Sequence, residues 1–419
     1  MLDLLRFTTA GSVDDGKSTL IGRLLFDSQA VFEDQLDHLA QASARRGGNG
    51  ALDLALLTDG LRAEREQGIT IDVAYRYFAT PRRRFIIADV PGHKQYTRNM
   101  VTGASTADVS VVLVDVRHGV VEQSRRHAYI SALLGIPHLV VAVNKMDLVD
   151  YDQDAFTRVA DEFGELAAGL GAADVCFIPI SALHGDNVVT RSEHMAWWEG
   201  PTLLEQLEGV EVIHDHPEAE LARFPVQWVI RPADGAGDYR GYAGQLASGR
   251  LRAGEEILVL PSGQRTRIAR IDTYDGPLDE AVAPQSVTLV LEDDLDIARG
   301  EMICTPESPP QVGRELEADV CWMSERPLDP RGRYAIKHNT LSARAAVEEI
   351  AHRVDMTSLR QQAAPGALAL NDIGRVRLQT SRELAFDPYA RNRSTGSFIL
   401  IDEASNDTVA AGMIAAPAA

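Results

Sequence analysis

Residues 11–18 read GSVDDGKS and lie between an apolar, β-rich stretch at residues 4–10 (LLRFTTA) and a helix-like stretch at residues 19–25 (TLIGRLL). They satisfy the pattern GxxxxGK[ST], in which glycines let backbone N–H groups converge on phosphate oxygens at the N-terminus of the following helix. The Lys17 ammonium can reach the β- and γ-phosphates, and the Ser18 hydroxyl can ligate Mg²⁺. We therefore expect a phosphate-binding loop, although a glycine-rich turn without a ligand fits the same letters. The residues expected to bind nucleotide here are Gly11, Ser12, Val13, Asp14, Asp15, Gly16, Lys17, Ser18 and Thr19.

Apolar stretches rich in β-formers alternate with helical patterns through the first half of the chain. They lie at residues 4–10, 85–89, 109–115, 139–143 and 176–180. This alternation predicts a doubly wound α/β domain with a mostly parallel sheet. Residues 72–78 alternate and precede a turn at Pro81, so we expect a further strand that forms a hairpin with residues 85–89 and makes the sheet mixed.

The second half changes to short β-prone segments after the charged stretch HDHPEAE at residues 214–220. Strand-like segments occur at residues 226–230, 241–247, 256–261, 265–272 and 287–291, and after the joint PESPP (306–310) at residues 316–323, 333–338, 343–352 and 373–378. This spacing predicts two small antiparallel β-barrel domains. The expected domains are therefore residues 1–213 (nucleotide-binding domain), 222–307 (barrel domain II) and 312–419 (barrel domain III).

The composition excludes several classes of protein. The 419 residues are 45% apolar and 24% charged, as in ordinary soluble proteins with room for two or three cores. A formal charge of −20 argues against a dominant contact with nucleic-acid phosphates. The longest apolar runs are far shorter than a membrane span and no signal-peptide core is present, so we expect a cytoplasmic protein without membrane contact. Cys176, Cys304 and Cys321 are far apart, which favours buried thiols over disulfides or a zinc site.

A second phosphate-side motif is DVPGH at residues 89–93, directly after the predicted strand at residues 85–88. A carboxylate at a strand's C-terminal end can hold a magnesium-bound water, so we expect this role for Asp89. The N–H of Gly92 can turn toward the γ-phosphate. His93 lies where a side chain that positions the attacking water is needed, and an imidazole can hydrogen-bond that water. A turn aspartate and a solvated loop histidine are the alternatives.

Two further motifs decide which base is bound. NKMD at residues 144–147 follows the strand-like residues 139–143, and the Asp147 carboxylate can accept from guanine N1–H and N2–H, a donor pair that adenine lacks. A mispaired base would leave a buried carboxylate unsatisfied, so such a site discriminates by about 10⁴ or more. The stem of Lys145 can cover the ring and Asn144 can tie this loop to the phosphate loop. Residues 181–183 (Ser181, Ala182 and Leu183) follow the strand-like residues 176–180 and can offer a backbone N–H to guanine O6. GTP with Mg²⁺ is the expected ligand.

A switch segment is expected at residues 64–70 (EREQGIT), between the first helix and residues 72–78. The Thr70 hydroxyl could complete Mg²⁺ coordination only while the γ-phosphate is present, although a threonine that starts a strand is the alternative. Val13 and Ile69 could form an apolar gate beside His93, or belong to the core. We thus expect Lys17, Thr70 and His93 to serve catalysis, and Ser18, Thr70 and Asp89 to hold the metal.

With these five segments in place, the first half of the chain resembles a GTPase of the elongation factor Tu and elongation factor 1-alpha superfamily. The whole chain resembles the superfamily's arrangement of a GTPase followed by two β-barrels, and residues 240–254 (RGYAGQLASGRLRAG) match its barrel signature. Residues 11–25, 52–57, 59–77 and 95–100 are similar to the large, GTP-hydrolysing subunits of sulfate adenylyltransferase. Translation factors typically carry Asp-His where this chain has Asp14-Asp15, and Val90 replaces the family's usual threonine.

This resemblance implies that GTP hydrolysis is coupled to the synthesis of adenylyl sulfate and pyrophosphate from ATP and sulfate, in sulfate assimilation. The adenylyl transfer would belong to a separate small catalytic subunit, in a heterodimer or a higher hetero-oligomer. In agreement, the sequence has no second phosphate loop, no HxGH and no glycine-rich pyrophosphatase loop. The alternatives are a translation-factor-like GTPase that delivers aminoacyl-tRNA, and a GTP-binding structural subunit with negligible turnover.

Three smaller features have simpler interpretations. Residues 82–84 (RRR) are expected to be a solvated turn at a hairpin tip, and His214 and His216 are expected to be solvated linker residues rather than a metal pair. Trp197 and Trp198 are expected to pack the first domain against its linker, with a partner-binding patch as the alternative. Some relatives carry an adenylylsulfate kinase after the barrels; residues 413–419 (MIAAPAA) fit either a natural end or a truncated linker to such a domain.

Overall fold

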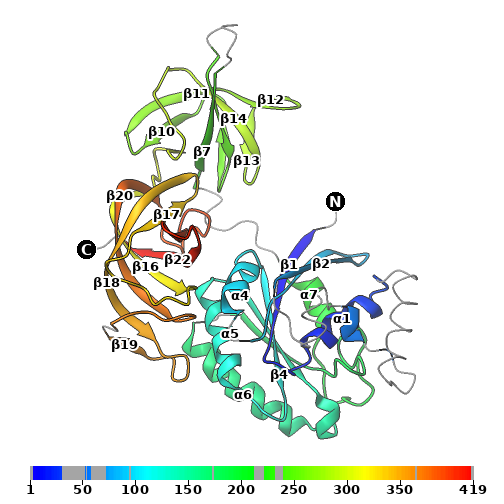
Figure 1. Cartoon of the computed structure of the whole chain (residues 1–419). Coiled ribbons are helices and arrows are strands. Elements are labelled where there is room, and N and C mark those ends of the chain that lie inside the picture. The colour runs from blue at the N-terminus through cyan, green and yellow to red at the C-terminus, as the bar shows by residue number, and fades with distance from the viewer. Residues whose placement is uncertain are drawn as a thin grey trace. The chain divides into compact units, whose positions relative to one another are not determined.

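The computed structural model describes residues 3–30, 52, 54–57, 72–93, 96–171, 174–211, 221–231, 239–363 and 366–416. The chain divides into two compact units, of which the first is formed mainly by residues 1–212 and the second by residues 213–355 and 359–419 (Figure 1). Among the described residues, no helix is both long and apolar enough to cross a membrane.

The first unit is built on a six-stranded sheet with the strand order β2-β3-β1-β4-β5-β6. The parallel strands are β1 (Leu4–Ala10), β3 (Arg84–Asp89), β4 (Val109–Asp115), β5 (His138–Asn144) and β6 (Asp174–Pro179). Strand β2 (Ala74–Ala79) is antiparallel to β3, as the sequence predicted. Every residue of β4 is buried, which is typical of a central strand covered on both faces by helices.

The helices of this unit are α1 (Lys17–Asp27), α4 (Thr97–Ala104), α5 (Glu122–Leu133), α6 (Gln153–Gly169) and α7 (Leu203–Gly209), with the 3₁₀ turns η1 (Leu54–Leu57) and η3 (Met146–Val149). Apolar residues of α1 and α7 share one core cluster with the sheet, whereas α4, α5 and α6 lie on the other side (Figure 1). Two N-termini are capped by side chains: Asp152 accepts from the backbone N–H of Ala155 at 3.0 Å, and Thr202 forms a capping box with Glu205.

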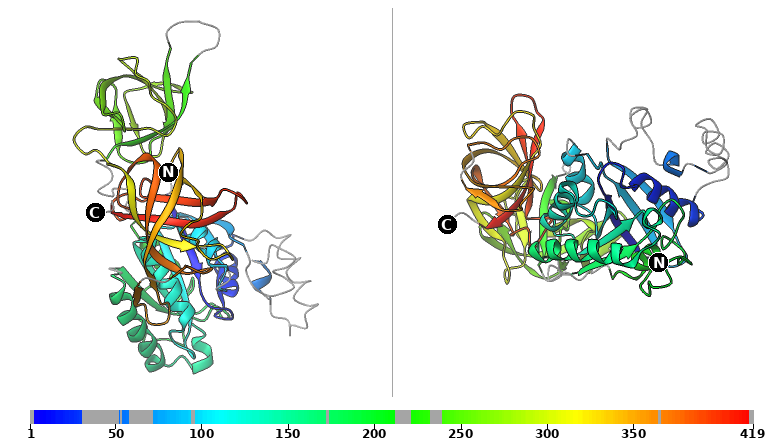
Figure 2. Two further views of the ribbon diagram at one scale, coloured as in Figure 1. Left: turned by 60° about the vertical axis from the view of Figure 1, so that its left-hand side comes forward. Right: turned by 90° about the horizontal axis from the view of Figure 1, so that it is seen from below.

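The second unit contains two closed antiparallel β-barrels (Figure 2). The first barrel has six strands, closed by the pairing of β10 with β11: β10 (Glu256–Leu260), β15 (Met302–Cys304), β7 (Arg223–Ile230), β8 (Gly241–Gln245), β14 (Ser286–Leu291) and β11 (Gln264–Thr273). Short strand β12 (Gly276–Leu278) extends it by pairing with β11, whereas β9 (Arg250–Arg252) and β13 (Glu280–Val282) pair with each other in a separate two-stranded sheet. Phe224, Tyr242 and Ile257 are buried in its core. Closure removes the exposed edges that an open sheet would present.

The second barrel closes through the pairing of β17 with β18. Its strands are β17 (Tyr334–His338), β21 (Ser397–Asp402), β22 (Thr408–Ala416), β16 (Gln311–Trp322), β20 (Ile373–Phe386) and β18 (Leu341–Val354), with β19 (Gln361–Ala363) added at the end of β18. Trp322, Phe386 and Phe398 lie in its core. The predicted order of an α/β domain and two barrels is therefore confirmed. The domain boundaries given above stay predictions, and the charged stretch at residues 214–220 lies outside the described residues.

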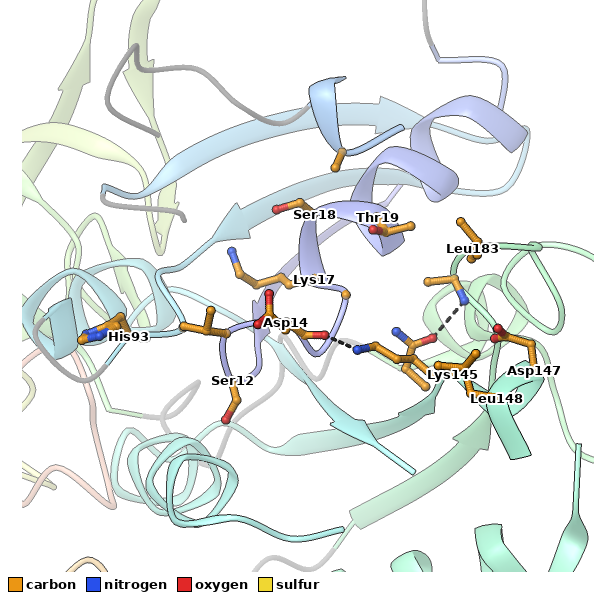
Figure 3. A pocket seen from close by; sticks show the side chains of 16 residues that line it. Ser12, Asp14, Lys17, Ser18, Thr19, His93, Lys145, Asp147, Leu148 and Leu183 are labelled. Carbon is orange, nitrogen blue, oxygen red and sulfur yellow. Dashed lines mark hydrogen bonds between the residues drawn. The ribbon is translucent and has the colours of Figure 1, made fainter. Parts of the chain in front are cut away.

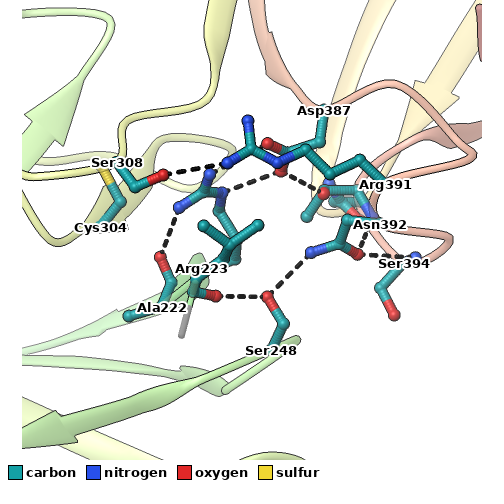
Figure 4. A network of polar contacts seen from close by, with 12 residues as sticks. Ala222, Arg223, Ser248, Cys304, Ser308, Asp387, Arg391, Asn392 and Ser394 are labelled. Atoms are coloured by element: carbon teal, nitrogen blue, oxygen red, sulfur yellow. Dashed lines mark hydrogen bonds and ion pairs between the residues drawn. The ribbon is translucent and has the colours of Figure 1, made fainter. Parts of the chain in front are cut away.

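A buried ion pair joins the two barrels of the second unit (Figure 4). Arg223, which begins β7, is fully buried and donates from Nε and Nη2 to the two oxygens of Asp387, at 2.8 and 2.9 Å. Burial opposes ionisation of Asp387, but the hydrogen bonds from Arg223 and Thr395 outweigh it, so the pKa of this carboxyl is lowered. Asn392 adds a contact from its Nδ2 to the Ser248 hydroxyl at 2.8 Å. The barrels therefore share a bidentate, fully hydrogen-bonded charge pair.

The prediction of a solvated hairpin tip is wrong for Arg83. Its guanidinium is only 8% exposed and donates to the backbone oxygens of Leu207 and Val210, at 3.1 and 2.6 Å, and to Asp3 at 2.7 Å. These carbonyls belong to the last turn of α7, where intrahelical donors are missing and a cation is favoured. Arg83 therefore holds the end of α7 to the sheet.

Trp197 and Trp198 pack against α6 of the first domain: their ring centroids lie 5.6 and 5.5 Å from that of Phe156. Residues 212–220, where the linker was expected, lie outside the described residues, so packing against the linker stays a prediction.

The prediction of three buried thiols needs one correction. Cys304 and Cys321 are buried, as expected for structural thiols, whereas Cys176 is only half-buried. Cys176 lies on β6, the edge strand of the sheet, and an edge strand is covered less completely than a central one.

Candidate nucleotide site

A cavity of about 540 Å³ lies at the carboxyl ends of the parallel strands (Figure 3). Most of the predicted site residues line it. They are Ser12, Val13, Asp14, Gly16, Lys17, Ser18, Thr19, Gly92, His93, Asn144, Lys145, Asp147, Ala182 and Leu183, joined by Ala55 and Leu148, which the sequence did not single out. Gly11, Asp15, Asp89 and Ser181 lie behind this lining. Ile69 and Thr70 lie outside the described residues.

Glycine is required at one position of the phosphate loop and at one position of the loop after β3 that contacts it. Gly16 has φ +93°, and a Cβ there would lie 2.5 Å from Nδ2 of Asn144. A Cβ on Gly92 would lie 2.3 Å from the carbonyl oxygen of Gly11, so the loop after β3 touches the phosphate loop directly. Because α1 begins at Lys17, the N–H groups of the loop gather at a helix N-terminus. This end of the cavity is suited to an anion.

Asp15 acts inside the loop rather than on its surface. Its Oδ2 accepts from the Ser12 N–H at 2.6 Å, and the side chain is only 5% exposed. Burial raises the pKa of this carboxyl to about 6; the Ser12 hydrogen bond counteracts part of the rise and the nearby Asp115 adds to it. Asn144 donates from Nδ2 to the Asp15 carbonyl at 2.7 Å. Asp15 therefore shapes the phosphate loop and connects it to the loop after β5.

Lys17 and Asp89 meet beneath the phosphate loop in a buried ion pair between Nζ and Oδ1. Ser18 follows in the first turn of α1. No group of three or more His, Cys, Asp or Glu residues in the described part of the chain could hold a metal ion by itself. Mg²⁺ usually keeps several waters and uses one or two protein oxygens together with substrate phosphates, so a hydroxyl and a single carboxylate fit this ion.

The other end of the cavity presents Asp147, which lies in η3. Its Oδ1 accepts from the Ser181 hydroxyl at 2.7 Å, so Ser181 orients the carboxylate. Leu183 and Leu148 add exposed apolar surface, with side chains 60% and 54% exposed. This combination of one oriented carboxylate and apolar walls suits a purine whose edge carries N–H donors.

The loop at residues 181–183 is held by two side chains, one of which the sequence did not reveal. Asn144 accepts the Ala182 N–H through Oδ1 at 2.9 Å. Arg23 of α1 donates to the carbonyl oxygens of Ala182 and Leu183 at 3.3 and 2.5 Å. Arg23 belongs to none of the sequence motifs, and the residues that it contacts lie about 160 positions further along the chain. These hydrogen bonds fix the peptide planes beside the base end of the cavity.

His93 lies at the opposite end of the cavity from Asp147, and Lys17 lies between them (Figure 3). The imidazole packs edge-on toward Tyr96, with ring centroids 6.2 Å apart. Val13, 44% exposed, belongs to the same cavity wall. A triphosphate that extends from the base end toward His93 would therefore pass over Lys17.

The comparisons with known proteins agree with this site. A family model described as the elongation factor Tu GTP binding domain matches residues 2–214, and one described as GTP-eEF1A C-terminal domain-like matches residues 315–415. The sheet, the cavity and these matches define a GTP-binding protein of the elongation factor Tu class, in which GTP is bound with Mg²⁺.

Relatives that match over nearly the whole chain include one bifunctional enzyme and two sulfate adenylyltransferase subunits. A bifunctional enzyme CysN/CysC of Mycobacterium tuberculosis is 57% identical over 416 residues, which are 99% of this chain and 67% of that protein. A sulfate adenylyltransferase subunit 1 of Bacteroides fragilis is 53% identical over 98% of this chain and 86% of its own length, and one of Shewanella oneidensis is 53% identical over 98% and 85%. The chain belongs to the sulfate adenylyltransferase subunit 1 family.

Proposed function

We propose that this chain is the GTP-hydrolysing subunit of an ATP sulfurylase and that it drives the formation of adenylyl sulfate and pyrophosphate from ATP and sulfate. The match to sulfate adenylyltransferase subunit 1 over nearly the full chain carries this proposal, together with a cavity that fits a guanine nucleotide. A phosphate–sulfate anhydride lies uphill of ATP in free energy. Hydrolysis of a second nucleotide is therefore needed to pull the reaction forward.

Base selection belongs to the carboxylate of Asp147. Held by the Ser181 hydroxyl at 2.7 Å, it accepts from N1–H and N2–H of guanine. Adenine has no such pair of donors, so binding ATP here would leave a desolvated carboxylate unpaired. The stem of Lys145 covers the ring, and the Leu183 N–H serves guanine O6, because the N–H groups of Ser181 and Ala182 already donate to the Asp186 carbonyl and to Asn144. These contacts fix the base and thereby the position of the phosphates.

On the phosphate side, the N–H groups of residues 11–19 bind the β- and γ-phosphates and Lys17 neutralises part of their charge. Ser18, Asp89 and Thr70 would hold Mg²⁺, which when bound neutralises charge that develops on the phosphates. Lys17 and Asp89 form an ion pair with each other. The ammonium proposed to bind phosphate and the carboxylate proposed to hold Mg²⁺ are therefore direct neighbours. Thr70 lies outside the described residues, and its role follows from the sequence alone.

His93 orients the water that attacks the γ-phosphate. The imidazole borders the cavity at the end away from the base, and the adjacent Gly92 packs closely against the backbone of the phosphate loop at Gly11. An imidazole nitrogen accepts a hydrogen bond from the attacking water, which places that water in line with the bond that breaks. Hydrolysis then follows from positioning and electrostatics, without a covalent intermediate on the protein.

The adenylyl transfer is assigned to a separate catalytic subunit, with which this chain forms a cytoplasmic hetero-oligomer. The relatives are named as one subunit of their enzyme, and a partner that carries the ATP and sulfate sites would complete it. The switch residues around Thr70 and His93 would transmit the state of the nucleotide to that partner.

Reconstitution tests the proposal. The chain is mixed with a candidate small subunit, and pyrophosphate release from ATP and sulfate is measured with GTP, with a non-hydrolysable GTP analogue and without nucleotide. We expect association in a pull-down, and rapid release only with GTP. Pyrophosphate release at the same rate with and without GTP would contradict the proposal. Tight, GTP-dependent binding of charged tRNA in a filter assay would favour a carrier of aminoacyl-tRNA instead.

A further inference from the structure

A buried carboxylate that none of the nucleotide motifs contains lies beside the base end of the site. Asp115 ends β4, next to Asn144 of β5 in the sheet, and is 1% exposed. Arg117 donates to it three times, from its backbone N–H at 3.0 Å, from Nε at 3.0 Å and from Nη2 at 2.6 Å. Burial alone would raise the pKa of Asp115. The hydrogen bonds from Arg117 and Lys145 have a larger effect in the opposite direction, so the pKa of Asp115 lies below its usual value. Asp115 is therefore a fixed negative charge.

Lys145 connects this charge to the phosphate loop. Its backbone is left-handed, with φ +66°, which turns the side chain back from η3 toward the loop after β1. Its ammonium contacts Asp115 Oδ2 at 2.9 Å and donates to the carbonyl oxygen of Asp14, a contact drawn in Figure 3. One lysine thus ties three loops together: those that follow β1, β4 and β5.

We propose that Asp115, itself oriented by Arg117, is a positioning residue for guanine binding. It holds the Lys145 ammonium against the Asp14 carbonyl, so that the stem of the lysine stays over the face of the base and the phosphate loop stays joined to the base loop. Asp115 touches neither base nor phosphate. It acts through Lys145.

The chemistry of the site explains why a carboxylate is used here. A Lys145 side chain held only by one carbonyl oxygen would exchange that contact for water, because an ammonium is strongly hydrated. A buried carboxylate makes the bound position of the ammonium favourable, and the three donors of Arg117 offset the cost of burying the charge. Preorganised in this way, the lysine loses little further freedom when the base arrives.

The proposal predicts the behaviour of the Asp115→Asn variant. Asparagine keeps the size of the side chain but removes its charge, so the charge-assisted contact with the Lys145 ammonium is lost. We expect GTP and GDP to dissociate about ten- to hundredfold faster. The factor should be the same for both nucleotides, because Lys145 acts on the base and not on the γ-phosphate. The preference for GTP over ATP should remain, since it depends on Asp147.

Stopped-flow displacement of fluorescently labelled GTP and GDP from the full chain measures these rates. A double-mutant cycle with Lys145→Met, which keeps the apolar stem and removes the ammonium, separates positioning from general stability. We expect Asp115→Asn to have no further effect in the Lys145→Met background. The matched control is Asp174→Asn, which removes an exposed carboxylate paired with His138 at the start of β6. Its dissociation rates should be those of the parent protein.

The same measurements can overturn the proposal. Unchanged dissociation rates in Asp115→Asn would do so, as would an effect of equal size in the Lys145→Met background, which would mean that Asp115 only stabilises the fold. Should Asp115→Asn fail to fold, Arg117→Ala takes its place. This variant keeps the carboxylate and loses two side-chain donors, so a smaller acceleration of the same sign is expected, and no acceleration would refute the proposal.

Discussion

Replacement of Asp15 by asparagine should stabilise the protein at neutral pH. Burial raises the pKa of this carboxyl from 3.8 to about 6, so the ionised form is less favourable in the folded than in the unfolded chain. At 1.36 kcal/mol for each pKa unit, the ionised carboxylate costs about 3 kcal/mol above pH 6. The amide oxygen of the substituted side chain would still accept the Ser12 N–H but more weakly than a carboxylate, which lowers the expected gain to about 2 kcal/mol.

The effect should depend on pH in a defined direction. Below pH 4 the Asp15 carboxyl is protonated in both folded and unfolded chains, so Asp15→Asn gains nothing. Between about pH 4 and pH 6 only the folded chain keeps the proton, so the free energy of unfolding of the parent falls as pH rises. Above about pH 6 both states are ionised and the difference between variant and parent becomes constant.

Urea unfolding of both proteins from pH 4.5 to pH 7.5 measures this difference, at low protein concentration because the isoelectric point is about 5.0. Asp14→Asn serves as the matched control, since Asp14 is the exposed neighbour in the same loop. A difference that does not change with pH, or a variant less stable than the parent at pH 7.5, would refute the argument from burial.

Three further predictions follow from the site and the fold. His93→Ala should keep GTP affinity and slow hydrolysis by about 10²–10⁴-fold, measured as phosphate release with saturating GTP; unchanged turnover would remove His93 from the mechanism. Asp147→Asn should weaken GTP binding by at least about tenfold in calorimetry, because it loses the pair of acceptors for guanine; equal affinity would mean that the base binds elsewhere. Arg83→Ala should lower the free energy of unfolding by about 2–4 kcal/mol, because it strips donors from the Leu207 and Val210 carbonyls and leaves Asp3 without this ion pair; a loss below about 0.5 kcal/mol would show that water replaces the guanidinium.

The sequence predicted the nucleotide loops because their chemistry is tied to residue types at fixed positions after strands. The strand at residues 4–10 and the one at residues 109–115 were predicted with the observed bounds. Their uninterrupted apolar character reflects burial in a parallel sheet. These loops can be predicted without the tertiary structure, because each one directly follows a strand that is itself visible in the sequence.

Other parts of the fold and site could not be predicted in this way. Strand β22 was missed because TVAAGMIAA is rich in alanine and glycine, which have low β propensity; its pairing with β16 and β21 is what makes it a strand. The contacts of Arg23, Arg83 and Asp115 join residues that no local pattern relates. These contacts can be recognised only in the three-dimensional structure. A buried charged residue requires partners, but a single sequence does not show which residues those partners are.

The Arg223–Asp387 ion pair affects how the two barrels would behave if the chain between them were cleaved. It bridges residues 164 positions apart and fastens two independently closed barrels to each other at a point buried from water. Cleaving the peptide between the barrels, at residues 306–310, is therefore expected to leave the last quarter of the chain bound to the first barrel.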